Sequence, residues 1–328
     1  MSSKFRTYFF IGKGGVGKTT CAASYAVKLA KEGVKTLIVS LDPAHNLGDV
    51  LDKPLTDTPE RVMENLDAIE VDFEKMITKH LKELSDKIKD IYSYLRVLNL
   101  DKYIDVLKHS PGIEEYATLD KITEILRDNM ERKKYDVIIF DTPPTGLTIR
   151  VMALPSVTLL WIRKLLELRL AILERRRVLE RILGERARVK IGDKVLELPS
   201  SITEDPIFKE LTSIKEEVEL VNKVLTDSER STVVMVVNPE LLPMLEAKRA
   251  YEFLLRLKIP VKYLVINKLI DEEGVPERFR VKVEEQRRSL ELVDKYFKGL
   301  KLIKIPLMVK EPRGIDDLIK ISEYLHID

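Results

Sequence analysis

Six short apolar runs recur along the chain, and segments with helical periodicity separate them. They are TYFFI at 7–11, TLIVS at 36–40, DVIIFD at 136–141, STVVMVVN at 231–238, YLVIN at 263–267 and LKLIKIP at 300–306. Most are apolar on both faces of a strand, which is typical of a parallel sheet covered by helices on either side. The pattern therefore predicts an α/β fold with a mostly parallel sheet flanked by helices.

Two long segments with helical periodicity interrupt this alternation. From Ile77 onward, apolar residues recur at steps of four and three, which places them on one helix face. These residues are Leu81, Leu84, Ile88, Ile91, Leu95 and Leu98. The second segment begins at Ser156, is apolar on most faces through Leu173, and is then heavily basic. The pattern of each segment therefore predicts a long helix.

A short hairpin and another helix follow the second segment. RVKIGDKVLEL at 188–198 is the hairpin candidate. Asp205 as the cap and Pro206 at the first position then predict a helix that stays in step to Leu225.

We expect these helices to form a subdomain inserted into the core. The predicted core comprises residues 1–74, 131–155 and 230–328, and the inserted helical subdomain comprises residues 75–130 and 156–229. Amphipathic helices usually pack on their own domain, so ordinary core is the alternative to a binding role for this layer.

A phosphate-binding loop lies between the first apolar run and the first helical segment. Gly12, Gly17, Lys18 and Thr19 fit the pattern G-x-x-x-x-G-K-[ST] in a strand–loop–helix context. Such a loop holds phosphates on backbone N–H groups, with its lysine on the β and γ phosphates and its hydroxyl on Mg²⁺. A glycine-rich turn without a ligand is the alternative. The residues expected to bind nucleotide are Gly14, Gly15, Val16, Gly17, Lys18, Thr19 and Thr20.

Lys13 is a second lysine in this loop. It projects from the first turn of the loop, where it cannot easily fold back onto its own nucleotide. It is either a solvated surface lysine or a residue that reaches a phosphate bound by another subunit, as an arginine finger does in trans. The spacing alone does not decide between the two.

Two aspartates stand at the ends of predicted strands, where open α/β sheets bind ligands. Asp42 follows the second run and Asp141 ends the third. One such carboxylate can orient water and another can lie near Mg²⁺, although each alone could also be a cap or turn residue. In NKLID at 267–271, Ile270 replaces the aspartate that would pair with guanine, so the sequence does not indicate GTP.

Composition narrows the class of protein. The 328 residues are 45% hydrophobic with a net charge of +2, which does not favour coating by nucleic acid. The uncharged stretch at 151–162 is shorter than the roughly 20 residues of a spanning helix, and we expect no signal peptide. Cys21 is the only cysteine, which excludes a disulfide or a two-cysteine metal site within one chain and fits a reducing cytosol.

The chain resembles a known family at several segments. They are GKGGVGKTT at 12–20, DPAHN at 42–46, DTPPTGLTIRVMALP at 141–155, NPELLPMLEAKR at 238–249 and PLMVKEPRG at 306–314. These segments are similar to the ArsA and tail-anchored-protein targeting ATPases, P-loop NTPases of the SIMIBI class with a deviant Walker A loop. The resemblance implies ATP and Mg²⁺ as cofactors and a nucleotide-gated homodimer.

The resemblance also implies roles for single residues near the phosphates. Lys13 is then the signature lysine that acts in trans on the phosphates of the partner subunit, beside Lys18 of the loop. Asp42 matches the residue that activates water. Asp141 matches the switch carboxylate, which we assign with Thr19 to the metal.

Other matched positions concern the base and the dimer. The resemblance implies that Asn267 contacts adenine and that Pro306 and Leu307 belong to the loop that closes over the base. Glu240 then leans across the dimer toward the nucleotide of the partner subunit.

The chain departs from the family pattern in several places. Pro143 and Leu147 replace an alanine and a histidine of the usual switch, and neither replacement removes a catalytic carboxylate. No C-x-x-C pair is present to share zinc across a dimer, and Cys21 alone cannot supply the thiolates that an arsenite site needs. The acidic segment 315–328 is a poor match for the membrane anchor of a positioning ATPase.

We therefore predict a cytoplasmic, Mg²⁺-dependent ATPase whose homodimer resembles the targeting factor for tail-anchored proteins. Its expected partners are the hydrophobic transmembrane helices of client proteins. Contact with the membrane is expected only through a receptor or a client, and no nucleic acid is expected. The alternatives are an arsenite-pump-like ATPase subunit, a MinD- or ParA-like positioning ATPase, and a metabolic ATPase that uses the fold alone.

Overall fold

The computed structural model describes all residues except 1–4, 45, 92–106, 187, 192–193 and 274. The chain divides into two compact units. The first comprises residues 1–73, 124–152 and 224–328, and the second comprises residues 74–123 and 153–223. That the helical segments form a client-binding layer stays a prediction.

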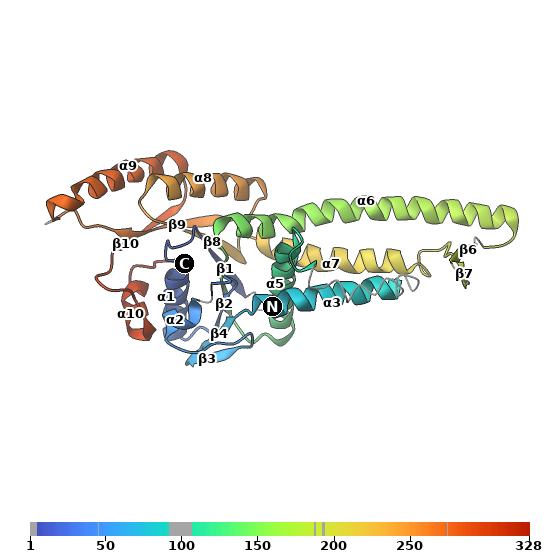
Figure 1. The fold of residues 1–328 in the computed structure, drawn as a ribbon, viewed down its shortest axis with the longest axis horizontal. Coiled ribbons are helices and arrows are strands. Elements are labelled where there is room, and N and C mark those ends of the chain that lie inside the picture. The colour runs from blue at the N-terminus through green and yellow to red at the C-terminus, as the bar shows by residue number, and fades with distance from the viewer. Residues whose placement is uncertain (1–4, 45, 92–106, 187, 192–193, 274) are drawn as a thin grey trace. The chain divides into compact units, whose positions relative to one another are not determined.

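A mostly parallel sheet forms the centre of the first unit (Figure 1). Within the described residues it has eight strands in the order β10-β9-β8-β1-β5-β2-β4-β3, and only the β3–β4 pair is antiparallel. All six apolar runs form strands of this sheet, which confirms the predicted fold class. The strands are β1 (Arg6–Ile11), β2 (Thr36–Ser40), β3 (Glu60–Met63), β4 (Leu66–Glu70), β5 (Val137–Asp141), β8 (Ser231–Val237), β9 (Val261–Leu269) and β10 (Lys301–Pro306).

The last two strands at one side of the sheet, β3 and β4, were not predicted. β4 reads LDAIE and carries two carboxylates, so it lacks the continuous apolar run of a central parallel strand. Asp67 is nevertheless buried, because the Tyr135 hydroxyl, the Lys134 ammonium and Arg61 Nε all bind its carboxylate. This strand is held by polar contacts that come from distant parts of the chain.

Helices cover both faces of the sheet in the first unit. Tyr8 and Phe10 pack in one core cluster with α1, α2 and α10. Successive strand residues face opposite sides, so Phe9 lies on the other face, where it stacks on Phe140. Helices α8 and α9 cover that second face (Figure 1). The bounds are α1 (Lys18–Lys31), α2 (Leu47–Leu51), α8 (Leu241–Arg256), α9 (Arg280–Tyr296, after the 3₁₀ turn Glu277–Phe279) and α10 (Gly314–Ser322).

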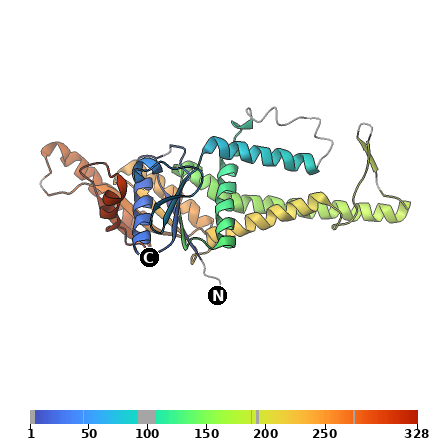
Figure 2. The same ribbon diagram turned by 90° about the horizontal axis from the view of Figure 1, so that it is seen from below.

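Long helices build the second unit. They are α3 (Phe73–Ile91), α5 (Ile113–Arg132), α6 (Thr145–Leu183) and α7 (Pro206–Thr226), with a hairpin of β6 (Arg188–Ile191) and β7 (Lys194–Glu197). The unit boundaries fall inside α5, α6 and α7, so each of these helices also extends into the first unit. Helices α6 and α7 lie side by side (Figures 1 and 2).

These elements confirm the predicted helices and hairpin as far as the structure describes them. α3 covers the predicted helical segment as far as Ile91, whereas Leu95 and Leu98 lie outside the described residues. α6 begins before the predicted segment and runs through Pro155 without a break, so Pro155 does not end a helix.

Asp205 caps α7 as predicted. Its Oδ1 accepts a hydrogen bond from the backbone N–H of Phe208 at 2.6 Å, and its carboxylate also pairs with Arg169 of α6. Asp205 is fully buried, so this pair satisfies a carboxylate that would otherwise be costly to bury.

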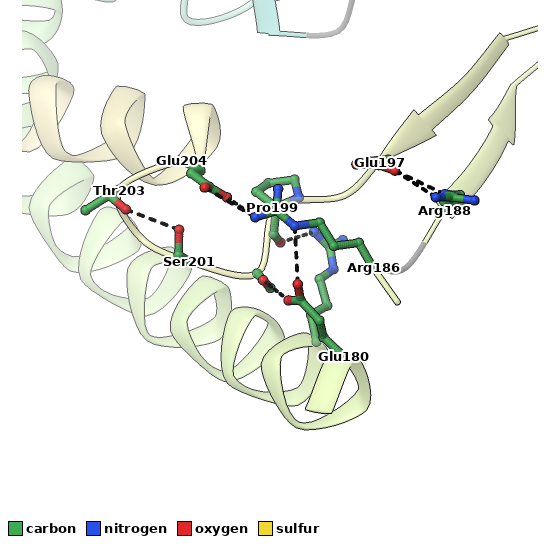
Figure 3. A network of polar contacts seen from close by, with 10 residues as sticks. Glu180, Arg186, Arg188, Glu197, Pro199, Ser201, Thr203 and Glu204 are labelled. Atoms are coloured by element: carbon green, nitrogen blue, oxygen red, sulfur yellow. Dashed lines mark hydrogen bonds and ion pairs between the residues drawn. The ribbon is translucent and has the colours of Figure 1, made fainter. Parts of the chain in front are cut away.

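A surface network fixes the far end of α6 to the segment that leads into α7 (Figure 3). Arg186 pairs with Glu180 and with Glu204, each at 3.2 Å, and the carbonyl of Pro199 accepts a bond from Arg176. The same side chains therefore join a helix end to a turn-rich segment.

Among the described helices, α6 is long and apolar enough to cross a membrane by length and composition alone. Its most apolar 18-residue window has at most two charged residues, and 39% of that window is buried. The sequence analysis considered only the uncharged residues 151–162, and this stretch is shorter than the apolar window of α6. Much of this apolar surface lies open to solvent in the described chain.

Candidate functional site

The phosphate loop joins β1 to α1 and needs glycine at two positions. Gly17 is the N-cap of α1 with φ of 91°, a conformation that other residues rarely adopt. A Cβ at Gly17 would lie 2.3 Å from Asn267 Nδ2, and one at Gly12 would lie 2.3 Å from the Val236 carbonyl oxygen. The loop therefore packs directly on β8 and on the end of β9.

Side chains from the end of β9 hold two carbonyl groups of the loop. Asn267 Nδ2 donates to the Val16 carbonyl and Lys268 Nζ donates to the Gly15 carbonyl, each at 2.8 Å. Because the C=O and N–H of one planar peptide unit point in opposite directions, these contacts turn the next N–H groups, those of Val16 and Gly17, away from β9. The loop thus presents backbone donors at a helix N-terminus, which suits an anion.

Lys18 and Asp42 form a buried ion pair beside this loop. Lys18 Nζ lies 3.4 Å from Asp42 Oδ2, and both residues are less than a tenth exposed. Asp42 Oδ1 also accepts the backbone N–H of Ala44 at 3.1 Å, which fixes the carboxylate at the start of the segment after β2. The structure therefore brings the predicted phosphate lysine and the predicted water-activating aspartate together.

Asp141 ends β5 close to this pair and has unmet bonding capacity. It is completely buried, and both of its carboxylate oxygens lack a hydrogen-bond partner within the described residues. Burial raises the pKa of Asp141 to about 7, although the charge of Lys18 and the nearby Thr19 hydroxyl oppose that shift. A carboxylate in this state is costly unless a cation joins it.

The residues present fit Mg²⁺. This ion prefers oxygen ligands and keeps several waters, so Asp141 and the Thr19 hydroxyl would supply the protein's share beside phosphate oxygens. The described part of the chain contains no cluster of three or more His, Cys, Asp or Glu side chains that could hold a metal. A metal held mainly by substrate and water is consistent with that finding.

Glu70 belongs to this region and was missed by the sequence analysis. Its Oε1 accepts the backbone N–H groups of Leu47 at 3.0 Å and Gly48 at 3.2 Å. These bonds hold the first turn of α2, which follows the Asp42 segment. Because β4 was not predicted, nothing in the sequence pointed to a carboxylate at the end of that strand.

Threonines anchor the segment between Asp141 and α6. The Thr142 hydroxyl donates to the Phe10 carbonyl of β1 at 2.8 Å, and the Thr148 hydroxyl donates to the Pro143 carbonyl at 2.6 Å. The backbone N–H of Thr145, where α6 begins, donates to the Gly12 carbonyl at 3.2 Å. The predicted switch therefore contacts the phosphate loop directly.

Lys13 lies apart from the buried pair. Its ammonium is 3.9 Å from Glu246 Oε2 of α8, and its side chain is half exposed. The structure therefore leaves Lys13 at the surface of the first unit, consistent with either interpretation of this lysine.

Two of the residues that the resemblance assigns to the base and the dimer border a separate cavity. Glu240 and Leu307 line this cavity of about 640 Å³ together with Lys268, whereas Asn267 and Pro306 are not among its lining residues. Leu307 is held by its backbone N–H on the Leu269 carbonyl at 2.7 Å, directly after Pro306 ends β10. Because Lys268 also bonds the phosphate loop, this cavity adjoins the loop.

We expect Gly17→Ala to destabilise the nucleotide-free protein, because the new Cβ would collide with Asn267 and the backbone would be strained at positive φ. The expected loss is about 1–3 kcal/mol. Thermal unfolding without nucleotide measures it. Gly14→Ala is the matched control, since its Cβ meets nothing within 4 Å. Equal melting temperatures for the two variants would contradict the proposed packing of the loop on Asn267.

Comparison with known proteins identifies relatives along almost the whole chain. The family model of anion-transporting ATPases, the ArsA ATPases, matches residues 5–327. The chain is 32% identical to ATPase GET3C of Arabidopsis thaliana, over 95% of this chain and 80% of the relative. It is 32% identical to an Aquifex aeolicus (strain VF5) protein provisionally named arsenical pump-driving ATPase 2, over 98% of this chain and 99% of the relative. It is 30% identical to ATPase ASNA1 homolog 1 of Paramecium tetraurelia, over 97% of this chain and 91% of the relative.

These matches confirm the resemblance drawn from the loop and the strand-end segments. The relatives are named as ATPases, and the site has a phosphate loop with a buried lysine and two carboxylates at strand ends. ATP hydrolysis is thereby confirmed as the activity, with ATP as the nucleotide. The chain belongs to the anion-transporting ATPase (ArsA) family.

Proposed function

We propose that this ATPase works as a Mg²⁺-dependent homodimer in the cytoplasm and captures the transmembrane helices of client proteins. The observation that carries the client assignment is a stripe of exposed apolar residues along α6. We call it the α6 stripe, and it comprises Val157, Leu160, Trp161, Leu165, Leu168, Val178, Leu179, Ile182 and Leu183.

The α6 stripe occupies one side of its helix. At about 100° per residue, its members fall within an arc of about 140°. Trp161 and Leu168 are 64% and 59% exposed, and Ile182 is 72% exposed. Exposed Lys164 and Arg175 fall within the same arc, so the stripe is apolar surface interrupted by two cations. Exposed apolar surface rimmed by polar residues marks an interaction site.

A transmembrane helix is the occupant that this stripe fits best. An apolar face on a helix of 39 residues is longer than one membrane span, and a bound helix can lie along it in the helix-in-groove mode. The resemblance to the tail-anchored targeting branch supports the same class of client. Nucleotide-driven pairing of two subunits would close the groove from the second side, and membranes would be met only through a client or a receptor.

The chemistry of hydrolysis follows from the Lys18–Asp42 pair. Without nucleotide, Lys18 is neutralised by Asp42. An ATP γ-phosphate would compete for that ammonium and release the Asp42 carboxylate to orient the attacking water. Mg²⁺, held by Thr19 and Asp141, would neutralise charge that develops on the phosphate oxygens.

Homodimer formation gives Lys13 a role. Its exposed ammonium is paired only loosely with Glu246, so it is available to a phosphate bound by a second copy of the chain. Glu240 is exposed at the start of α8, on the border of the cavity beside the loop, where a second copy could also be met. Asn267 and Leu307 would then enclose the base.

An arsenite-pump role finds less support in this chain, despite the name of the Aquifex relative. Arsenite binding requires soft thiolate ligands. Cys21 is the only cysteine, it is buried in α1, and burial raises its thiol pKa to about 12. A protonated thiol inside the core cannot serve as that ligand.

We expect Asp42→Asn to bind ATP and lose hydrolysis by about 100-fold or more, because an amide cannot accept a proton from water. Steady-state ATPase assays and nucleotide binding measure the two effects separately. Asp52→Asn, at the exposed C-cap of α2, serves as the control and should retain turnover. Near-normal turnover of Asp42→Asn would remove Asp42 from the proposed mechanism.

Lys13→Ala should bind nucleotide but fail to form the ATP-dependent dimer. The physical reason is the loss of a cation that would neutralise phosphate across the interface. Sedimentation with ATP and Mg²⁺, in the Asp42→Asn background to prevent turnover, measures the dimer. Lys31→Ala, at the exposed end of α1, is the matched control. A dimer that persists in Lys13→Ala would return Lys13 to the surface-lysine interpretation.

We expect the double variant Trp161→Glu and Leu168→Glu to lose capture of a polypeptide with one C-terminal hydrophobic helix. Two buried charges would make the groove too polar for such a helix. Co-purification from co-expression, with Asp42→Asn protein held in ATP, measures capture. Leu255→Glu, at an apolar position on α8 that is 50% exposed, is the control and should capture normally. Undiminished capture by the double variant would reject the α6 stripe as the client site.

A further inference from the structure

A second charged cavity lies at the amino-terminal ends of the strands, in the first unit. It has a volume of about 200 Å³ and is lined by Lys35, Arg61, Asn65, Asp67, Lys134 and Tyr135. Lys35 immediately precedes β2, Asn65 precedes β4, and Tyr135 lies just before β5. The phosphate loop and the nucleotide carboxylates lie at the opposite, carboxyl-terminal ends of these parallel strands.

The cavity carries more positive charge than its carboxylate can neutralise. Three of its six lining side chains are cationic and one is anionic. Lys134 Nζ lies 3.0 Å from Asp67 Oδ2, and Arg61 Nε lies 2.5 Å from Asp67 Oδ1. Lys35 Nζ has no ion-pair partner within the described chain, and the nearby Asp136 carboxylate instead accepts the Lys35 backbone N–H. The lining residues therefore carry a net charge of +2, and the Asp136 carboxylate beside Lys35 lowers the net charge around the cavity to +1.

Asp67 orients these cations, and they keep hydrogen-bond donors that do not bind Asp67. Arg61 uses only Nε on Asp67 among the described contacts, which leaves both terminal nitrogens of the guanidinium fork. The ammonium of Lys134 has three donors and uses one on Asp67, while it also lies 4.8 Å from the centre of the Tyr135 ring. Burial opposes the shift, but the hydrogen bond from the Tyr135 hydroxyl and the contact with these cations hold the pKa of Asp67 below its usual value, so the carboxylate stays charged.

The walls of the cavity are fixed by contacts outside it. Asn129 brackets Tyr135, because its Oδ1 accepts the Tyr135 N–H at 2.9 Å and its Nδ2 donates to the Tyr135 carbonyl at 3.0 Å. The Tyr135 hydroxyl donates to Asp67 Oδ2 at 2.8 Å. Asn65 sits at positive φ and donates to the Ala30 carbonyl of α1. These contacts therefore fix the cavity that the cations line before any ligand binds.

We propose that this cavity is a second anion site, distinct from the nucleotide site, and that it binds a phosphate group through Lys35, Arg61 and Lys134. A phosphate group offers more acceptor oxygens to the three cations than a single carboxylate does. The guanidinium fork suits the geometry of phosphate oxygens, and the two ammonium groups add point charges. The volume admits inorganic phosphate or the terminal phosphate of a monoester.

Titration with inorganic phosphate tests the proposal when the nucleotide site is already filled. The protein is saturated with Mg²⁺ and a non-hydrolysable ATP analogue, so that the phosphate loop is occupied, and binding is followed by calorimetry. We expect phosphate to bind at one site, with an affinity that falls as the salt concentration rises, since the cations of the site are partly exposed.

Lys35→Gln is the decisive variant. Lys35 does not bind Asp67, so its removal deletes one charge without leaving that carboxylate unpaired. We expect phosphate affinity to fall about tenfold, with an unchanged melting temperature in the absence of phosphate. Arg61→Gln should weaken binding similarly, and Lys31→Gln, an exposed lysine of α1, should leave it unchanged. Equal phosphate affinity in Lys35→Gln and Lys31→Gln, or no second site in the native chain, would overturn the proposal.

A second arm distinguishes the source of the phosphate group. O-phosphoserine is titrated under the same conditions. If it binds as tightly as inorganic phosphate, the cavity accepts a phosphate carried on a larger molecule. If only inorganic phosphate binds, the cavity is a site for the free ion. Failure of both ligands contradicts the proposal and leaves the proposed ATPase cycle untouched, because none of these side chains contacts the nucleotide site.

Discussion

The contact between the end of β9 and the phosphate loop is the constraint on which the nucleotide site depends. Asn267 and Lys268 hold the carbonyl groups of Val16 and Gly15, which orients the backbone donors of the loop. The same Asn267 amide occupies the space that a side chain at Gly17 would need. Loop conformation, the start of α1 and the position of Lys18 therefore follow from one long-range contact between residues about 250 positions apart in the chain.

The balance of charge at this site explains why a nucleotide with a metal would suit it. Lys18 faces Asp42 at 3.4 Å, while the Asp141 carboxylate is buried without a hydrogen-bond partner in the described residues. One ammonium cannot neutralise both carboxylates, and burial accordingly raises the pKa of Asp141. A bound cation would remove that deficit, and a phosphate would replace Asp42 as the partner of Lys18. The site without ligand is thus electrostatically incomplete in a way that ATP and Mg²⁺ together would correct.

The sequence predicted what short-range pattern and spacing determine. The six predicted strands are mostly continuous apolar runs. Asp205 followed directly by Pro206 indicated the start of α7. Spacing and strand position also identified Lys18, Asp42 and Asp141. β4 escaped prediction because its burial depends on Tyr135, 68 residues away, which satisfies Asp67. Glu70 was missed with that strand, and no local pattern could reveal that it holds the first turn of α2.

The nucleotide role of Asn267 illustrates the limit of resemblance. The family match implied a contact with adenine, and that role stays a proposal. The structure shows a different contact, because the Asn267 amide donates to the loop itself. A residue at a strand end can serve both loop and ligand, since its Oδ1 and Nδ2 are separate groups. Here Oδ1 accepts the Lys268 N–H at 2.9 Å, so a base would have to share an atom that already has a partner.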